Sequence, residues 1–125
     1  MKKVITSKSA PAPIGPYSRA VQAGNFVYLS GAIALKADGS LEQSSIEAET
    51  RQVLENMRTV LQDAGLGFEH LVKTSIFLTD MKDFAEVNKI YAAYFSSDFP
   101  ARETVQVAAL PAGARVEISG VAYNG

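Results

Sequence analysis

The chain has 125 residues, a formal net charge of −1 and a hydrophobic fraction of 47%, which together predict one soluble domain over residues 1–125. It contains no cysteine, so disulfides, thiolate nucleophiles and cysteine-ligated metals are excluded. The near-neutral charge disfavours nucleic acid as a partner, and no apolar run is long enough to cross a membrane, so we expect a cytoplasmic protein.

The first quarter of the chain predicts a shaped loop followed by a β-hairpin. Three prolines within residues 9–16 prevent a regular helix and favour an extended or turning path. Residues 19–23 and 26–30 are then separated by a Gly-Asn pair, which suits a two-residue turn with positive φ at its first position. The second of these segments is apolar on both faces over residues 26–29, and Gly31 follows it, where another group can approach the backbone closely.

A helix and a strand follow the hairpin. Apolar side chains recur at helical spacing over residues 46–64. Ser44 and Glu47 predict a capping box at the start of this helix, and Gly65 predicts its end. β-branched side chains then alternate over residues 71–78 and predict a strand.

A second helix is predicted over residues 83–95, and two further strands over residues 103–109 and 115–123. Asp83 and Glu86 predict a capping box, and the short loop between the two strands predicts a C-terminal hairpin. This order indicates an α+β or mixed α/β class. Two helices can cover only one face of such a sheet, although several strands are apolar on both faces, so we expect oligomerisation to cover the other face.

Metal catalysis and conventional nucleophilic catalysis have little support in the sequence. His70 is the only histidine and has no second ligand at helical spacing, which is typical of a surface loop residue just before a strand. Asp80, Asp83 and Glu86 do not match a calcium loop and are better explained as acids at a helix start. There is no nucleophile-elbow motif around a serine and no phosphate-binding glycine loop. We therefore expect neither a metal nor a cofactor.

Four polar or aromatic residues remain as candidates for binding or activating a small ligand. Arg102 follows a proline-fixed turn and carries a planar fork that suits a carboxylate, although a solvated or salt-bridged arginine is the commoner explanation. Glu117 lies between two apolar strand residues and must face opposite to them, which is also typical of a solvated charge. Tyr17 and Asn88 are, taken singly, compatible with packing and with an exposed surface.

Short motifs spread along nearly the whole chain carry a family resemblance. They are Ile-Gly-Pro-Tyr-Ser at 14–18, Tyr-Leu-Ser-Gly at 28–31, Asp-Phe-x-x-Val-Asn-x-x-Tyr at 83–91, Phe-Pro-Ala-Arg at 99–102, Val-x-x-Leu-Pro at 107–111 and Val-Glu-Ile at 116–118. With these motifs, in order and at matching spacing, the sequence resembles the reactive-intermediate deaminase family, also called RidA, YjgF or L-PSP.

The resemblance implies both a fold and a reaction. The fold is a single α+β domain of the chorismate-mutase-like type, with a mixed β-sheet and two helices on one face. It assembles as a homotrimer with active sites between subunits. The reaction hydrolyses 2-iminobutanoate and 2-iminopropanoate, reactive enamine/imine intermediates from pyridoxal-phosphate-dependent dehydratases, to 2-keto acids and ammonia. The family needs no metal or cofactor.

The resemblance also implies roles for individual residues. Arg102 would bind the substrate carboxylate, and Glu117 would orient or deprotonate the attacking water. The pocket would be lined by Tyr17, Ser30, Gly31, Phe84, Asn88 and Thr104, with Tyr17 coming from the neighbouring subunit. A simple hairpin between the last two strands does not place Arg102 opposite Glu117, so their meeting at one site is implied by the family alone.

Three positions depart from the family pattern. Many members have cysteine where this chain has Thr104, so no thiol can act at this position. The glutamine that often follows the Ser-Gly pair is Ala32, and the second glutamate of the common Glu-Ile-Glu is Ser119. Both of the latter departures bear on the polarity of the pocket and on the range of substrates.

Two other functions are compatible with the same residues. A binding module that captures small carboxylates or metabolic enzymes would use the same arginine, but it would gain nothing from the nearby negative charge of Glu117. The ribonuclease or translation-inhibitor activity that older family names imply is the least supported, because the chain is nearly neutral and has one histidine. An imine deaminase is the function that we expect.

Overall fold

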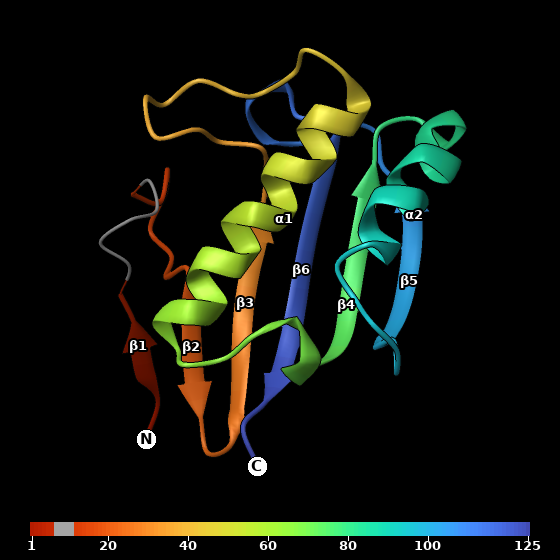
Figure 1. Cartoon of the computed structure of the whole chain (residues 1–125). Helices are drawn as coiled ribbons and strands as arrows, with labels where there is room; N and C mark the ends of the chain where they lie inside the picture. Colours follow the sequence, from red (N-terminus) through yellow and green to blue (C-terminus); the bar gives the residue numbers. More distant parts are fainter. Residues whose placement is uncertain (7–11) are drawn as a thin grey trace.

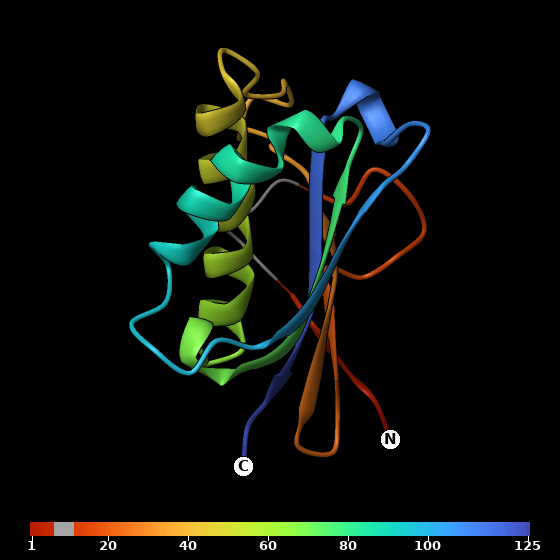
Figure 2. The same cartoon turned by 90° about the vertical axis from the view of Figure 1, so that its right-hand side faces the viewer.

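The structure is a computed structural model of the chain, and it describes residues 1–6 and 12–125; residues 9–11 of the predicted proline-rich loop lie outside this part. In the described part, one six-stranded mixed sheet has the order β1-β2-β3-β6-β4-β5. The strands are β1 (Lys3–Ile5), β2 (Ala20–Ala23), β3 (Phe26–Ala32), β4 (Leu71–Leu78), β5 (Ala101–Gln106) and β6 (Val116–Tyr123). Two helices, α1 (Ile46–Asp63) and α2 (Phe84–Ala92), lie on one face of the sheet (Figures 1 and 2). The α+β class is confirmed.

The predicted N-terminal hairpin is confirmed. β2 and β3 pair antiparallel, and Gly24 in their turn has a φ of +60°. β3 then pairs with β6, but the register shifts between Leu29 and Ala32, so that Ser30 and Gly31 together face a single residue of β6. Such a bulge breaks the regular alternation and re-aims side chains. It lies at two of the predicted site residues.

The predicted C-terminal hairpin is wrong. β5 does not pair with β6; it runs parallel to β4, and β4 separates it from β6. The reason is that β6 carries the fully buried Val116 and Ile118 and takes a central place, where it pairs with β3 and β4 on its two sides. The connection between β5 and β6 includes a 3₁₀ turn (Pro111–Gly113) and is long enough to pass one strand.

The capping residue predicted for α1 is also wrong. The N-cap is Ser45, whose Oγ accepts a hydrogen bond from the Ala48 N–H at 2.9 Å. The Ser44 hydroxyl instead donates to the Glu42 carboxylate at 2.7 Å, so it is not available to cap the helix. The end of α1 agrees with the prediction, because Gly65 follows the C-cap with a φ of +76°.

α2 is shorter than the predicted helix over residues 83–95, and its predicted capping box is absent. The Asp83 side chain makes no capping bond, and a 3₁₀ turn (Met81–Asp83) precedes the helix. The Asp80 carboxylate caps that turn by accepting a backbone N–H at 2.9 Å. Asp80 rather than Asp83 is the capping acid because the 3₁₀ turn precedes the helix and moves the capping position three residues toward the N-terminus.

The core lies between the helices and one face of the sheet, and no helix of the described residues covers the other face (Figure 2). Figure 2 shows both helices on the same side. Large apolar side chains that alternate with the core residues are 40–49% exposed on the open face: Val4, Phe26, Tyr28, Val105 and Tyr123. The prediction that two helices cover one face only is therefore confirmed. No helix in residues 1–6 and 12–125 is long and apolar enough to span a membrane.

Candidate functional site

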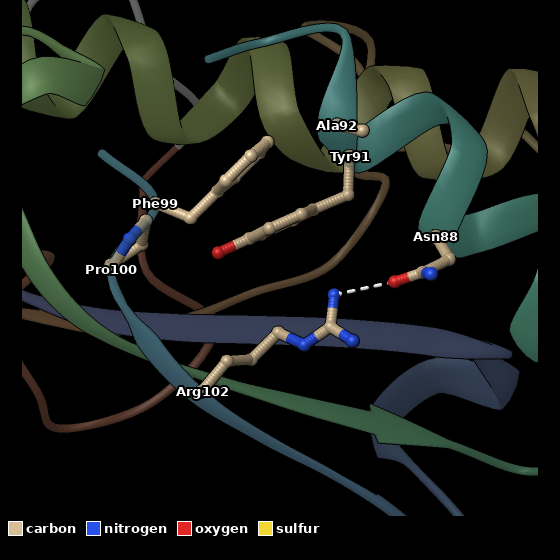
Figure 3. A pocket seen from close by; sticks show the side chains of 6 residues that line it. All are labelled: Asn88, Tyr91, Ala92, Phe99, Pro100 and Arg102. Atoms are coloured by element: carbon tan, nitrogen blue, oxygen red, sulfur yellow. Dashed lines mark hydrogen bonds between the residues drawn. The ribbon is translucent and has the colours of Figure 1, made fainter. Parts of the chain in front are cut away.

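Arg102 lies against α2 on the helix-covered face of the sheet. In the β4–β5 register it is opposite Thr74, which is fully buried. Its Nη1 donates a hydrogen bond to Asn88 Oδ1 at 2.6 Å (Figure 3). Its Cζ lies 5.1 Å from the centre of the Tyr91 ring and 5.8 Å from that of the Phe84 ring. The guanidinium is thus held by three side chains of one helix.

The spacing of those three residues explains why α2 can hold the arginine. Phe84, Asn88 and Tyr91 are four and three residues apart, so they project from one side of the helix. Asn88 lies beside the buried apolar residues of α2 and is half-buried. Because Asn88 lies off the apolar face of α2, the sequence alone suggests a surface residue. In the structure this position puts the Asn88 amide against Arg102.

One edge of the guanidinium remains available. Asn88 accepts from Nη1, whereas Nε and Nη2 of Arg102 bond no atom in the part of the chain that the structure describes. The N–H groups on Nε and Nη2 lie on the same edge of the planar group and match the two oxygens of a carboxylate. Within the described residues Arg102 also has no ion pair with an acidic side chain, so the alternative of a salt-bridged arginine is not supported there.

A cavity of about 290 Å³ lies beside Arg102. It is lined by Asn88, Tyr91, Ala92, Phe99, Pro100 and Arg102 (Figure 3). This volume has room for a small organic acid next to the guanidinium. Sequence reasoning did not assign Tyr91, Phe99 or Pro100 to the site, although all three lie inside the quoted motifs. Their positions inside these motifs are the signal in the sequence by which all three could have been assigned to the site.

Thr104 lies on the same face as Arg102, two residues further along β5. It is opposite the buried Ile76, and its Oγ1 is buried without a hydrogen-bond partner among residues 1–6 and 12–125. Buried hydroxyls usually have a partner, so this unpaired one is unusual. Thr104 is not among the residues that line the cavity beside Arg102.

Glu117 lies on the opposite face of the sheet. Its neighbours Val116 and Ile118 are fully buried on the helix side, so Glu117 points the other way. Its carboxyl group packs against Gly31, where an added Cβ would lie 2.7 Å from Glu117 Cδ. A Cβ at this position would force the end of the Glu117 side chain to shift, so glycine is what lets the carboxyl group lie against the strand. Burial raises the pKa of Glu117, so its carboxylate is held in a less favourable environment than in water.

Two further predicted residues lie near Gly31. The Ser30 hydroxyl donates to the backbone carbonyl of Ser18 at 2.6 Å, which ties the bulge of β3 to the loop that carries Tyr17. Tyr17, Ser30 and Gly31 share the lining of a small depression, and Tyr17 is 43% exposed. The structure therefore brings together residues that are far apart in the sequence.

The predicted site residues thus fall into two groups. The arginine group is Phe84, Asn88, Arg102 and Thr104, and the glutamate group is Tyr17, Ser30, Gly31 and Glu117. Arg102 is opposite Thr74 and Glu117 is opposite Phe77, so they are separated by about 10 Å across two strand spacings and about 10 Å along the strands. Their side chains also point to opposite faces. One chain does not bring Arg102 and Glu117 into one site.

The described residues contain no group of three or more histidine, aspartate or glutamate side chains arranged to hold a metal ion. His70 lies in a 3₁₀ turn (Phe68–His70) just before β4, as predicted for a residue preceding that strand. Its Nδ1 accepts the backbone N–H of Gly67 at 3.0 Å. This bond gives the histidine a local structural role.

The raised pKa of Glu117 leads to a prediction about stability. We expect Glu117→Gln to unfold at a higher urea concentration than the parent at neutral pH, and the difference to shrink as the pH is lowered. A carboxyl whose pKa is raised by folding stabilises the fold below its unfolded-state pKa, and this contribution is lost as the pH rises through the folded-state pKa. Glutamine mimics the protonated form at every pH. Urea unfolding of both proteins from about pH 4 to about pH 8 measures the effect; a difference that stays constant over this range would contradict it.

Comparison with known proteins gives matches over the whole chain. Residues 7–124 match the family described as Endoribonuclease L-PSP. A 2-iminobutanoate/2-iminopropanoate deaminase of Mus musculus is 46% identical over 126 residues, covering 100% of this chain and 93% of the relative. The crystal structure of YyfA from Yersinia pestis, of the conserved Rid protein family, has a TM-score of 0.95 at 48% identity and covers 98% of this chain and 99% of that one. The structure of TdcF from E. coli with bound serine has a TM-score of 0.93 at 34% identity, with coverage of 98% and 99%.

Proposed function

The chain belongs to the endoribonuclease L-PSP family, also called RidA or YjgF, and on this basis we propose that it is a 2-iminobutanoate/2-iminopropanoate deaminase. The observation that carries the proposal is the 46% identity to such a deaminase along the whole chain. The reaction adds water to the imine carbon and breaks the carbon–nitrogen bond, so that a 2-imino acid and water become a 2-keto acid and ammonia. The family description also names an endoribonuclease, but a net charge of −1 and a single histidine favour no RNA chemistry.

In this reaction Arg102 would bind the carboxylate of the imino acid through Nε and Nη2. The support for this role is that Asn88 occupies only Nη1 and that a cavity adjoins the guanidinium. A relative, TdcF, has been solved with serine, an amino acid with the same kind of carboxylate. Phe84 would contribute an apolar wall, and Thr104 an unpaired hydroxyl. Gripping both carboxylate oxygens sets the position of the imine carbon, which is itself electrophilic and asks for little further activation.

Glu117 would orient or deprotonate the attacking water. Its raised pKa supports this role, because a carboxylate in a desolvated environment accepts a proton more readily than one in water. Gly31 lies against its carboxyl group, and Ser30 and Tyr17, which share a depression with Gly31, would line the same side of the pocket. This chemistry uses neither a metal nor a cofactor.

The site would be completed between copies of the chain, in a homotrimer. Two observations support this assembly: Arg102 and Glu117 lie on opposite faces of one chain, and the open face of the sheet exposes large apolar side chains. Arg102 of one subunit would then meet Glu117 of the next. Analytical ultracentrifugation should give a mass of about three chains; an active, monodisperse monomer would contradict the shared site.

Thr104 offers a test of whether the chemistry is covalent. We expect Thr104→Ala to keep kcat/KM within about tenfold of the parent, because the variant loses at most one neutral hydrogen bond to the substrate. No base in the described residues is hydrogen-bonded to the Thr104 hydroxyl to activate it as a nucleophile. The matched control is Thr59→Ala. The Thr59 hydroxyl is exposed on α1 and donates to the backbone carbonyl of Glu55 in the same helix. Near-complete loss in an assembled Thr104→Ala variant would indicate covalent catalysis.

The proposed activity is tested by coupling the purified protein to a pyridoxal-phosphate-dependent threonine or serine dehydratase. Keto-acid release from the free imine should be faster with the protein than without it, in proportion to its concentration. This assay also separates an enzyme from a carboxylate-binding module, which would bind 2-oxobutanoate but leave the rate unchanged. Unchanged release at all protein concentrations would overturn the proposed function.

A further inference from the structure

A buried hydrogen bond lies directly behind Arg102. The Tyr91 hydroxyl and Thr74 Oγ1 are 2.7 Å apart, and both residues are almost completely buried, with 4% and 0% of their surface exposed. Thr74 is also the residue of β4 that pairs with Arg102 in the sheet. The backbone of Arg102 and the side chain of Tyr91 are therefore tied to the same residue.

The same tyrosine supports the guanidinium of Arg102. The Arg102 Cζ lies 5.1 Å from the centre of the Tyr91 ring, within the range of a cation–π contact. The Asn88 bond to Nη1 fixes how the guanidinium is rotated, and the ring fixes how far it lies from the helix. An unsupported arginine loses much rotamer freedom when it binds a ligand, whereas an arginine already held in place loses less.

The Tyr91 hydroxyl has a structural partner and is poorly suited to acid–base work. Burial raises the pKa of Tyr91, so the phenol stays protonated at neutral pH. Its bond to Thr74 holds the ring edge toward the sheet, and Phe95 packs against the ring at 4.9 Å between ring centres. Loss of the Tyr91 hydroxyl would leave the ring packed but would remove its hydrogen bond to Thr74 of β4, the residue that pairs with Arg102.

We propose that Tyr91, held by Thr74, is a positioning residue of the deaminase: it orders the guanidinium of Arg102 for the substrate carboxylate before the substrate arrives. The inference rests on the proposed function, because it assigns the carboxylate to Arg102. It goes beyond that function because it assigns a role to the hydrogen bond between Tyr91 and Thr74. This bond lies away from the reacting atoms but determines how tightly the imino acid is bound.

The first test is a split between KM and kcat. Tyr91→Phe and Thr74→Val should each raise KM by roughly three- to tenfold and leave kcat nearly unchanged, because each loses one hydrogen bond that acts on carboxylate binding. The double variant should be no worse than either single variant, since both changes remove the same bond. Tyr91→Leu, which also removes the ring, should raise KM further.

Tyr94→Phe is the matched control. Tyr94 lies one turn beyond Tyr91, and its hydroxyl bonds the Glu55 carboxylate at 2.7 Å rather than any residue of the site. This variant should lose stability without a change in KM. If assembled Tyr91→Phe and Thr74→Val raise KM no more than Tyr94→Phe, or if their effects multiply in the double variant, the positioning role is wrong.

A second measurement keeps this inference separate from the proposed function. In the ligand-free protein labelled with ¹⁵N, the Arg102 Nε–Hε signal, assigned by its loss in Arg102→Lys, should have a high order parameter that falls in Tyr91→Leu and Tyr91→Phe but not in Tyr94→Phe. An unchanged order parameter in Tyr91→Leu would overturn the positioning role even if the parent is an active deaminase. If the parent proves inactive, the proposed function fails, and this signal still decides whether Tyr91 orders Arg102.

Discussion

Arg102→Ala should lower kcat/KM for 2-iminobutanoate by roughly a hundredfold or more. The carboxylate is the only strongly charged group of the substrate, and the substitution removes two charge-assisted hydrogen bonds worth about 1.5–3 kcal/mol each. The imine carbon also loses its fixed distance from the water, which adds a kinetic cost. Stopped-flow or coupled measurement of keto-acid release on freshly generated imine gives the ratio directly.

Arg102→Lys and Arg51→Ala separate this effect from a loss of charge or of fold. Lysine keeps the charge but loses the planar fork and the Asn88 geometry, so Arg102→Lys should also be strongly impaired. Arg51 is half-exposed on α1 in a helical pair with Glu47, and Arg51→Ala should leave turnover unchanged. An Arg102→Ala protein that assembles and melts like the parent, yet hydrolyses the imine at the parent rate, would disprove the carboxylate role.

Mixing two inactive variants should restore activity. Arg102→Ala and Glu117→Gln should each be nearly inactive as pure proteins, because each lacks one half of every site. When subunits of the two are refolded together in equal amounts, about a quarter of the sites should combine an intact Arg102 from one subunit with an intact Glu117 from another. The recovered rate should therefore approach a quarter of the parent rate.

A second mixture serves as the control. The parent refolded with an equal amount of the double variant Arg102→Ala/Glu117→Gln should also show about a quarter of its sites active if the site is shared, but about half if each site lies within one chain. Light scattering on each mixture confirms that the subunits have assembled. No recovery in the first mixture, together with half activity in the second, would show that Arg102 and Glu117 act within one subunit.

Local patterns of the sequence determined several elements of this fold. The strand β4 (Leu71–Leu78) has the predicted bounds. Alternating β-branched side chains favour a strand with one buried face, and this preference can be recognised in the local sequence. The hairpin turn at Gly24 and the glycine after α1 are confirmed because a positive φ strongly favours glycine. Helical spacing also predicted that Phe84 and Tyr91 share one face of α2, whereas it placed Asn88 off the apolar stripe, and only the structure shows the Asn88 amide against Arg102.

Tertiary structure alone decided which strands pair and where the two groups of site residues lie. β5 pairs with β4 rather than β6 because the apolar β6 is most stable between two strands, a preference that no local pattern records. Ser45 rather than Ser44 caps α1 because the Ser44 hydroxyl is hydrogen-bonded to the Glu42 carboxylate. Alternation already required Glu117 to face away from Val116 and Ile118, but only the position of the helices shows that Arg102 points to the covered face and Glu117 to the open one. That separation arises from packing between segments distant in sequence, and it is the physical reason for expecting a site shared between subunits.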